Sequence, residues 1–191
     1  MDLILASTSA YRRALLERLR INFRCVAPQV DETPLPGERP APLASRLALA
    51  KARAVAGANP EALVIGSDQV AELDGQVLGK PGDAARAAAQ LRASSGREVR
   101  FHTGVALVRE SDGFEALAVE PFRVRFRELD DAEIGRYLAL DEPFDCAGSF
   151  KSESLGIALF ESLEGDDPTA LEGLPLIRLC AQLRRAGLAV P

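Results

Sequence analysis

The chain opens with a strand-like run that leads through small hydroxyl residues into a helix. The apolar run 3–6 is followed by Ser7-Thr8-Ser9 and then by Ala10-Tyr11-Arg12-Arg13. A strand that ends just before a helix N-terminus points free backbone N–H groups and the positive end of the helix dipole at one spot, which suits phosphate oxygens. Two arginines on the first turn add bidentate donors. The pattern predicts an α/β protein with an anion site here, and its simpler alternative is a capped helix with a solvated first turn.

Composition limits the classes of protein to consider. The 191 residues are 47% hydrophobic and carry a formal net charge of −5, so we expect a globular protein without a broad nucleic-acid-binding face. No apolar run approaches the roughly 18 residues of a membrane span, and no cationic leader precedes the first strand. The three cysteines are widely spaced among apolar neighbours, which predicts buried thiols in a reducing compartment, and so a cytoplasmic protein. They are Cys25, Cys146 and Cys180.

Hydrophobic periodicity and turn residues predict alternating helices and strands in a single mixed α/β domain over residues 1–191. Helices are expected at 10–19, at 43–56 after a proline-rich loop (28–42), at 84–94 capped by Asp83, at 131–140 capped by Asp130, and from 167 to 187 with starts at Asp167 and Pro175. Strands are expected at 3–6, 23–27, 63–66, 98–109, 114–126 and 156–160, with an Asp74-Gly75 hairpin turn leading to Leu78.

Four charged residues are candidates for chemistry. Asp68 is expected directly after a buried strand, where a carboxylate can hold a divalent cation or deprotonate water; otherwise it caps a turn. Lys80 lies between Gly79 and Pro81 and can reach a phosphate; otherwise it is an exposed loop lysine. Glu32 in the proline-rich loop and Lys51 in the second helix are equally open, between a site and a solvated surface.

Other constellations are missing from the sequence. The single histidine, His102, lies in a predicted strand and is interpreted as structural, because no His/Cys/carboxylate set suggests zinc and no nucleophile pairs with it. The glycines at 66, 79 and 82 form neither a dinucleotide-binding nor a P-loop fingerprint. The sequence therefore gives no support to kinase or dehydrogenase activity.

Several motifs, in order, resemble the Maf family of nucleoside triphosphate pyrophosphatases. They are Leu-Ala-Ser-Thr-Ser-Ala-Tyr-Arg-Arg (5–13), Val-Asp-Glu-Thr (30–33), Arg-Leu-Ala-Leu-Ala-Lys-Ala (46–52), Gly-Ser-Asp-Gln-Val (66–70) and Gly-Lys-Pro (79–81). Three further segments resemble the branch that acts on 7-methyl-GTP: 146–153, 165–168 and 173–177. The resemblance spans essentially the whole chain.

The resemblance implies an elongated, twisted mixed β-sheet flanked by helices, in two lobes with a central cleft (a Maf/ITPase-like fold), frequently as a homodimer. It implies hydrolysis of a nucleoside triphosphate to the monophosphate and pyrophosphate with a divalent metal, Mg²⁺ or Mn²⁺. The proton acceptor falls on Asp68, which with Glu32 would hold the metal. The residues expected to bind the triphosphate are Ser7, Ser9, Arg12, Arg13, Lys51 and Lys80, and those expected to set base specificity are Tyr11, Gln69 and Glu153.

The expected activity is hydrolysis of 7-methyl-GTP, which would clear modified nucleotides. N7-methylation makes guanine a cation, which favours an aromatic face such as that of Tyr11 and a carboxylate such as that of Glu153. Three alternatives stay open: a pyrophosphatase for UTP, dTTP or another non-canonical nucleotide, a nucleotide-binding regulator of septum formation, and a generic phosphatase.

Overall fold

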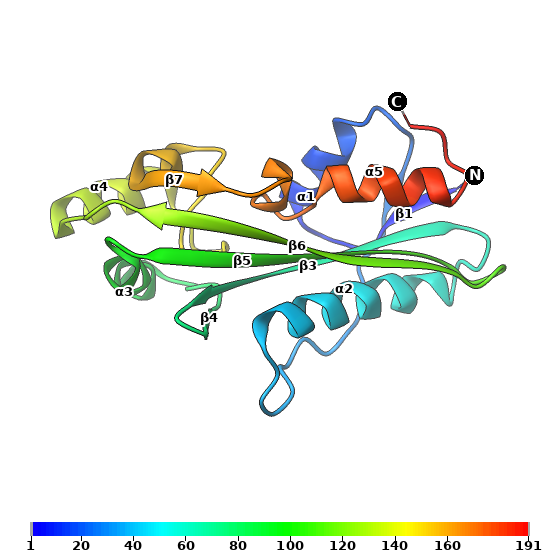
Figure 1. Cartoon of the computed structure of the whole chain (residues 1–191), viewed down its shortest axis with the longest axis horizontal. Helices are drawn as coiled ribbons and strands as arrows, with labels where there is room; N and C mark the ends of the chain where they lie inside the picture. The colour runs from blue at the N-terminus through cyan, green and yellow to red at the C-terminus, as the bar shows by residue number, and fades with distance from the viewer. Residues whose placement is uncertain (1, 191) are drawn as a thin grey trace. The chain divides into compact units, whose positions relative to one another are not determined.

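A mixed sheet of seven strands and five α-helices make up residues 2–190, the part of the chain that this computed structural model describes (Figure 1). The strands are β1 (Leu3–Leu5), β2 (Arg24–Cys25), β3 (Leu63–Leu73), β4 (Gln76–Leu78), β5 (Glu98–Arg109), β6 (Phe114–Phe126) and β7 (Phe160–Glu164). The α-helices are α1 (Ala10–Glu17), α2 (Pro40–Ala56), α3 (Ala84–Ser94), α4 (Asp131–Asp141) and α5 (Leu176–Arg185), and two short 3-10 helices are η1 (Leu155–Leu159) and η2 (Pro168–Ala170).

The strand order is β2-β1-β3-β5-β6-β7, with β4 paired to β3 off this path. β1 pairs in parallel with both β2 and β3, whereas β4 is antiparallel to β3 and β7 is antiparallel to β6. The expected α/β class and mixed sheet are thereby confirmed. The chain divides into two compact units, of which the first comprises the residues up to Gln69, Thr103–Glu120 and those from Asp167 onward, and the second comprises Val70–His102 and Pro121–Asp166. The single-domain description stays a prediction.

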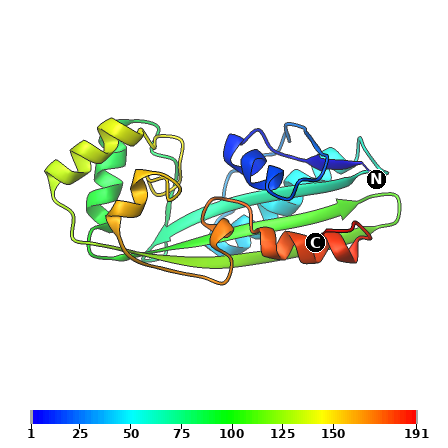
Figure 2. The same ribbon diagram turned by 90° about the horizontal axis from the view of Figure 1, so that it is seen from above.

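The first unit has three layers, and the alternation of side chains along its strands explains them. Leu3 and Leu5 belong to the core formed with α1 and α5, while Ile4 and Ala6 belong to the core formed with α2. Successive residues of a strand point to opposite faces, so an apolar strand buried on both faces needs a helix layer on each. Figures 1 and 2 show α2 on one face of the sheet and α1 and α5 on the other.

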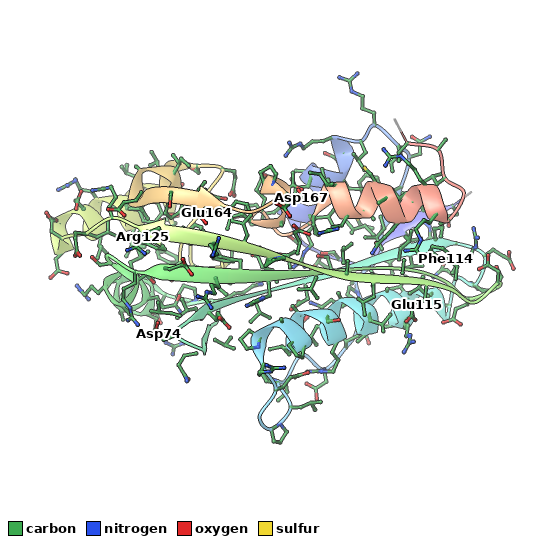
Figure 3. All side chains as sticks on the ribbon, viewed as in Figure 1. Asp74, Phe114, Glu115, Arg125, Glu164 and Asp167 are labelled. Atoms are coloured by element: carbon green, nitrogen blue, oxygen red, sulfur yellow. The ribbon has the colours of Figure 1, made fainter. Side chains whose placement is uncertain are left out.

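The second unit packs α3 and α4 together beside the ends of β5 and β6. Asp83 caps α3 by accepting from the Arg86 N–H, and Asp130 caps α4 in a capping box with Glu133, as the sequence predicts. The expected Asp74-Gly75 turn joins β3 to β4, with positive φ at both residues (49° and 79°), which is typical of tight hairpins (Figure 3 labels Asp74). The core of this second unit contains the edge-to-face packed rings of Phe101, Phe126, Phe150 and Phe160.

Four local predictions are wrong. Helix α2 begins at Pro40 rather than at Leu43, because prolines are tolerated in a first turn whose N–H groups have no helical partner. The expected strand 156–160 is the 3-10 helix η1, in which the Gly156 N–H bonds back to the Lys151 carbonyl, and the strand starts only at Phe160. The strand expected at 63–66 continues to Leu73, which places Asp68 inside it. None of the three cysteines is buried as expected: Cys25 is exposed and Cys146 and Cys180 are half-buried, although all three are free thiols.

Candidate active site

Lys51 is the centre of a charge cluster in the first unit. Its Nζ lies 2.6 Å from Asp68 Oδ1 and 2.8 Å from Glu32 Oε1, so one ammonium binds two carboxylates that come from a strand and a loop. The side chains of Lys51 and Asp68 are only 7% and 11% exposed, whereas that of Glu32 is 60% exposed. Lys51 is thus buried and bonded to a buried aspartate. It does not lie on a solvated face of α2, which was the alternative left open by the sequence. Two members of the cluster, Lys51 and Asp68, are therefore buried, and the carboxylate of Glu32 faces solvent.

Two glycines allow α2 to lie unusually close to the sheet. A Cβ on Gly66 would stand 2.1 Å from the Ala48 carbonyl oxygen and 2.6 Å from the Ala52 nitrogen, and a Cβ on Gly104 would stand 2.3 Å from the Ala44 carbonyl oxygen. The facing helix positions are alanines, so backbone packs almost directly against backbone. This close approach brings Lys51, next to Ala52, within a hydrogen bond of Asp68, two residues beyond Gly66.

Asp68 lies on β3 beyond the point where β1 ends. β1 ends at Leu5, which pairs with Ile65, and the following Ala6 N–H donates to the Ile65 carbonyl. Beyond that point β3 runs on without β1 beside it, and the β1–α1 turn begins. The prediction that Asp68 follows its strand is wrong, yet the strand end that matters is that of its neighbour β1.

Serine hydroxyl oxygens accept backbone N–H groups at the β1–α1 turn. Ser9 caps α1 by accepting from the Arg12 N–H at 3.3 Å, and the Ser7 hydroxyl oxygen accepts from the Ser9 N–H at 3.1 Å. Both serine oxygens act as acceptors in these bonds, so each hydroxyl keeps its own O–H as a donor. Such hydroxyls at a helix N-terminus suit an anionic ligand.

The two arginines of α1 have different surroundings. Arg12 donates from Nε to the Gly173 carbonyl at 2.9 Å; burial lowers its pKa, and the charges of Asp68 and Glu32 oppose that shift. Arg12 is therefore close enough to the Lys51 cluster to feel both carboxylates. Arg13 is exposed and forms an i,i+4 ion pair with Glu17 at 3.0 Å. The structure brings Arg12 to the cluster and leaves Arg13 on the helix surface.

Gln69, next to Asp68, has a fixed amide. Its Nε2 donates to the carbonyls of Ala170 (2.8 Å) and Leu171 (3.0 Å) and to the Thr103 hydroxyl (3.1 Å). Two carbonyl acceptors on one side require the NH₂ group there, because an amide oxygen would repel them. The atom of this amide that takes no part in these bonds is Oε1, a hydrogen-bond acceptor.

The stretch from η2 to the start of α5 supplies these carbonyls, and Asp167 holds it in place by hydrogen bonds. This buried carboxylate accepts from the N–H and the hydroxyl of Thr169 and from the Ile177 N–H at 2.6–3.0 Å (Figure 3 labels Asp167). The same segment presents the Gly173 carbonyl to Arg12. Sequence reasoning identified Asp167 only as a helix start and missed the supporting role of this segment, although its Gly-Asp-Asp-Pro and Gly-Leu-Pro-Leu-Ile motifs were a signal.

The other predicted site residues have simpler placements. Tyr11 is half-buried on α1, beside Arg12. Lys80, after β4, and Glu153, before η1, belong to the second unit, and both are exposed. Their part in a site stays a prediction, as does that of Arg13.

The side chains of the Lys51 cluster that could bind a metal ion are the carboxylates of Asp68 and Glu32. Among residues 2–190 no group of three or more His, Cys, Asp or Glu side chains is arranged to hold a metal ion. Asp68 and Glu32 nonetheless converge on one cation, that of Lys51, and their oxygens are the ligand type that Mg²⁺ prefers. His102 lies 3.5 Å from Glu72 in the second unit, a cross-strand pair of partly covered side chains, in keeping with a structural role. No helix within the described range is long and apolar enough to cross a membrane.

Comparison with known proteins gives consistent relatives. The chain is 60% identical over 188 residues to a 7-methyl-GTP pyrophosphatase from a Polaromonas species, an alignment that covers 98% of this chain and 86% of that protein. It is 58% identical to proteins of the same name from Albidiferax ferrireducens (98% and 94% covered) and Aromatoleum aromaticum (99% and 97% covered). The fold is similar to the structure of the Staphylococcus aureus Ham1 protein, with a TM-score of 0.56 at 14% identity, covering 96% of this chain and all of that one.

The family model described as "Maf-like protein" matches residues 2–186. That range contains the strand-turn-helix with its serine caps, the Lys51 cluster and the segment that holds Arg12 and Gln69. A match of this extent, together with relatives of this identity, shows that the chain belongs to the Maf family.

Proposed function

We propose that this protein is a nucleoside triphosphate pyrophosphatase that hydrolyses 7-methyl-GTP to 7-methyl-GMP and pyrophosphate. The observation that carries the proposal is the buried Lys51–Asp68 pair beside the capped turn that precedes Arg12. This arrangement offers a proton acceptor and phosphate-binding donors on neighbouring elements. Relatives at 58–60% identity that are named for this activity support the choice of substrate.

The triphosphate is assigned to the β1–α1 turn and to Arg12. The hydroxyls of Ser7 and Ser9 and the N-terminus of α1 provide neutral donors, and Arg12 provides charge. Its Nε is held by the Gly173 carbonyl, so the guanidinium is oriented before the substrate binds. Arg13 and Lys80 are proposed as further phosphate contacts.

Asp68 is assigned as the proton acceptor for the attacking water. Lys51 fixes one of its carboxylate oxygens at 2.6 Å, which orients the carboxylate, and the second oxygen is the atom proposed to take the proton. Phosphoryl transfer depends mostly on such positioning and on stabilising the charge of the transferred group.

Charge balance favours a divalent metal. The charges of Lys51 and Arg12 are cancelled by those of Asp68 and Glu32, so these four side chains leave the roughly four negative charges of a bound triphosphate uncompensated. Mg²⁺ or Mn²⁺, which Asp68 and Glu32 would hold, would supply the missing positive charge.

Base selection is assigned to Tyr11, Gln69 and Glu153. The Gln69 Oε1 acceptor matches the N–H donors on the Watson–Crick edge of guanine. The positive charge of N7-methylguanine favours an aromatic face and a carboxylate, which Tyr11 and Glu153 are proposed to provide.

A substrate panel tests the proposal. Pyrophosphate and orthophosphate release are measured from 7-methyl-GTP, GTP, UTP and dTTP, each with Mg²⁺, Mn²⁺ or a chelator. Metal-dependent pyrophosphate release with the highest kcat/KM on 7-methyl-GTP is expected. A preference for UTP or dTTP would change the substrate, orthophosphate release would contradict pyrophosphatase chemistry, and binding without turnover would point to a regulator.

A cytoplasmic location and a homodimer are proposed as well, with nucleotides rather than nucleic acids or membranes as partners. The net charge of −5 disfavours binding to nucleic acid. Light scattering of the purified chain, with twice the monomer mass as the expected value, tests the homodimer.

A further inference from the structure

The loop that carries Glu32 is fastened to α2 by one arginine. Arg46 donates from Nε and Nη2 to the two carboxylate oxygens of Glu38, both at 2.7 Å, and from Nη2 to the Thr33 carbonyl at 3.1 Å. Glu38 also accepts from the Leu35 N–H at 2.9 Å. A planar guanidinium in bidentate contact fixes orientation as well as distance. Arg46 therefore ties down the backbone at the residue next to Glu32.

Within the loop two short-range hydrogen bonds add to this contact, from the Thr33 N–H to Asp31 Oδ1 and from the Glu38 N–H to the Leu35 carbonyl, both at 2.9 Å. Residues 31–37 are all exposed, so no buried apolar side chain anchors them. Glu38, which follows these residues, is better covered: 8% of its side chain is exposed, against 31% of that of Arg46. A shielded bidentate pair is a stronger restraint than an open surface ion pair.

Helix α2 supplies both side chains that bind the loop next to and at Glu32. Arg46 and Lys51 lie five residues apart on α2; the first binds Thr33 and the second binds Glu32 at 2.8 Å. The same helix packs closely on β3 through Gly66 and so also sets the distance from Lys51 to Asp68.

We propose that Arg46 and Glu38 are positioning residues for the cluster of Glu32, Lys51 and Asp68: their ion pair holds the loop so that Glu32 reaches Lys51. Neither residue is assigned a contact with substrate. The activity measurement of this inference rests on the proposed function. A second measurement, of loop opening, rests on the loop geometry alone.

A double-mutant cycle tests it. Glu38→Gln keeps the side-chain size, leaves Arg46 in place and removes the charged pair. Because a misplacement of ~1 Å can cost up to 10²-fold, we expect kcat/KM for pyrophosphate release to fall by about tenfold or more. In the Glu32→Gln background the same change should cost less than about twofold, because the group being positioned is already gone.

The cycle separates positioning from other roles. General destabilisation, or a direct phosphate contact of the clamp, would lower activity by the same factor in both backgrounds, and either result would overturn the proposal. So would an unaltered kcat/KM in Glu38→Gln alone.

Asp112→Asn is the matched control. At the β5–β6 turn Asp112 accepts from Nε and Nη2 of Arg109 and from the Phe114 N–H, the same kinds of donor as for Glu38, although both arginine bonds reach one oxygen, Oδ2, and 49% of its side chain is exposed. It should leave kcat/KM unchanged. A loss equal to that of Glu38→Gln would mean that breaking any such clamp impairs the enzyme, and would overturn the inference.

The second measurement does not use activity. In Arg46→Gln, cleavage after Glu32 by a glutamate-specific protease should be about tenfold faster than in the wild-type protein, because the loop opens more often. Unchanged cleavage would overturn the inference. If the wild-type protein released no pyrophosphate from any nucleotide, the proposed function would fail while cleavage still decided whether the clamp holds the loop.

Discussion

Gly66→Ala is the most direct test of how the site is built. The new Cβ would stand 2.1 Å from the Ala48 carbonyl oxygen and 2.6 Å from the Ala52 nitrogen. Both are backbone atoms of α2, so no flexible side chain can move aside. Ordinary contact begins near 3.4 Å, which means that α2 would have to retreat by about 1.3 Å.

Two effects of different size follow from that displacement. Overpacking of this kind costs typically ~1–3 kcal/mol of stability. Lys51 is next to Ala52 and would move with the helix, and since a displacement of ~1 Å at reacting groups can cost 10²-fold, kcat/KM should fall by about that factor. Activity should therefore suffer far more than folding.

The assay compares urea unfolding with pyrophosphate release, well below the melting temperature. Gly104→Ala is the first control, because its Cβ would also strike α2, at the Ala44 carbonyl, about two turns from Lys51. It should lose similar stability and much less activity. Gly135→Ala, in α4 with open space around it, should be neutral or more stable by ~0.5–1 kcal/mol with wild-type activity. Wild-type kcat/KM in Gly66→Ala, despite lost stability, would refute the reasoning.

Three further outcomes are expected. Asp68→Asn should lower kcat by about 10²–10⁴-fold with the fold intact in circular dichroism, because general-base loss has that size; wild-type turnover would remove Asp68 from the mechanism. Gln69→Glu should bring carboxylate oxygens against two backbone carbonyls and lower the melting temperature more than Gln69→Met, and the reverse order would contradict the fixed amide. Hydrogen bonds from Arg46 and the Leu35 N–H hold the pKa of Glu38 at about 2, below its usual 4.5, so its stabilisation is full above pH 4.5 and is lost toward pH 2; the gap in melting temperature between wild type and Glu38→Gln should narrow on acidification, and a widening gap would contradict the ion pair.

Features set by neighbouring residues could be predicted from the sequence. The caps by Asp83 and Asp130 and the Asp74-Gly75 turn depend on contacts within three or four residues, and all are confirmed. The strand expected at 156–160 is wrong because a few apolar residues fit a short helix as well as a strand, and here Gly156 packs closely on the Lys151 backbone in η1.

Features set by distant partners could not be predicted in the same way. The segment from Ser67 to Gln69 has low strand propensity, yet it continues β3, because β3 has the neighbour β5 and its side chains are buried. Lys51 and Asp68 were candidates on separate grounds, and their contact depends on how closely α2 lies on β3. The amide of Gln69 is oriented by carbonyls about a hundred residues away.

The cluster therefore depends as much on missing side chains as on charged ones. A lysine in the middle of a helix normally buries only its alkyl stem and keeps its charged ammonium in solvent. Gly66, with Ala48 and Ala52 opposite, lets α2 lie directly on the backbone of β3 at one place. The ammonium of Lys51 then bonds to the carboxylate of Asp68 away from solvent. Salt screens the attraction between two such buried charges only weakly. Small residues at this crossing serve the site by setting a distance, and for that reason the glycine substitution should lower activity more than stability.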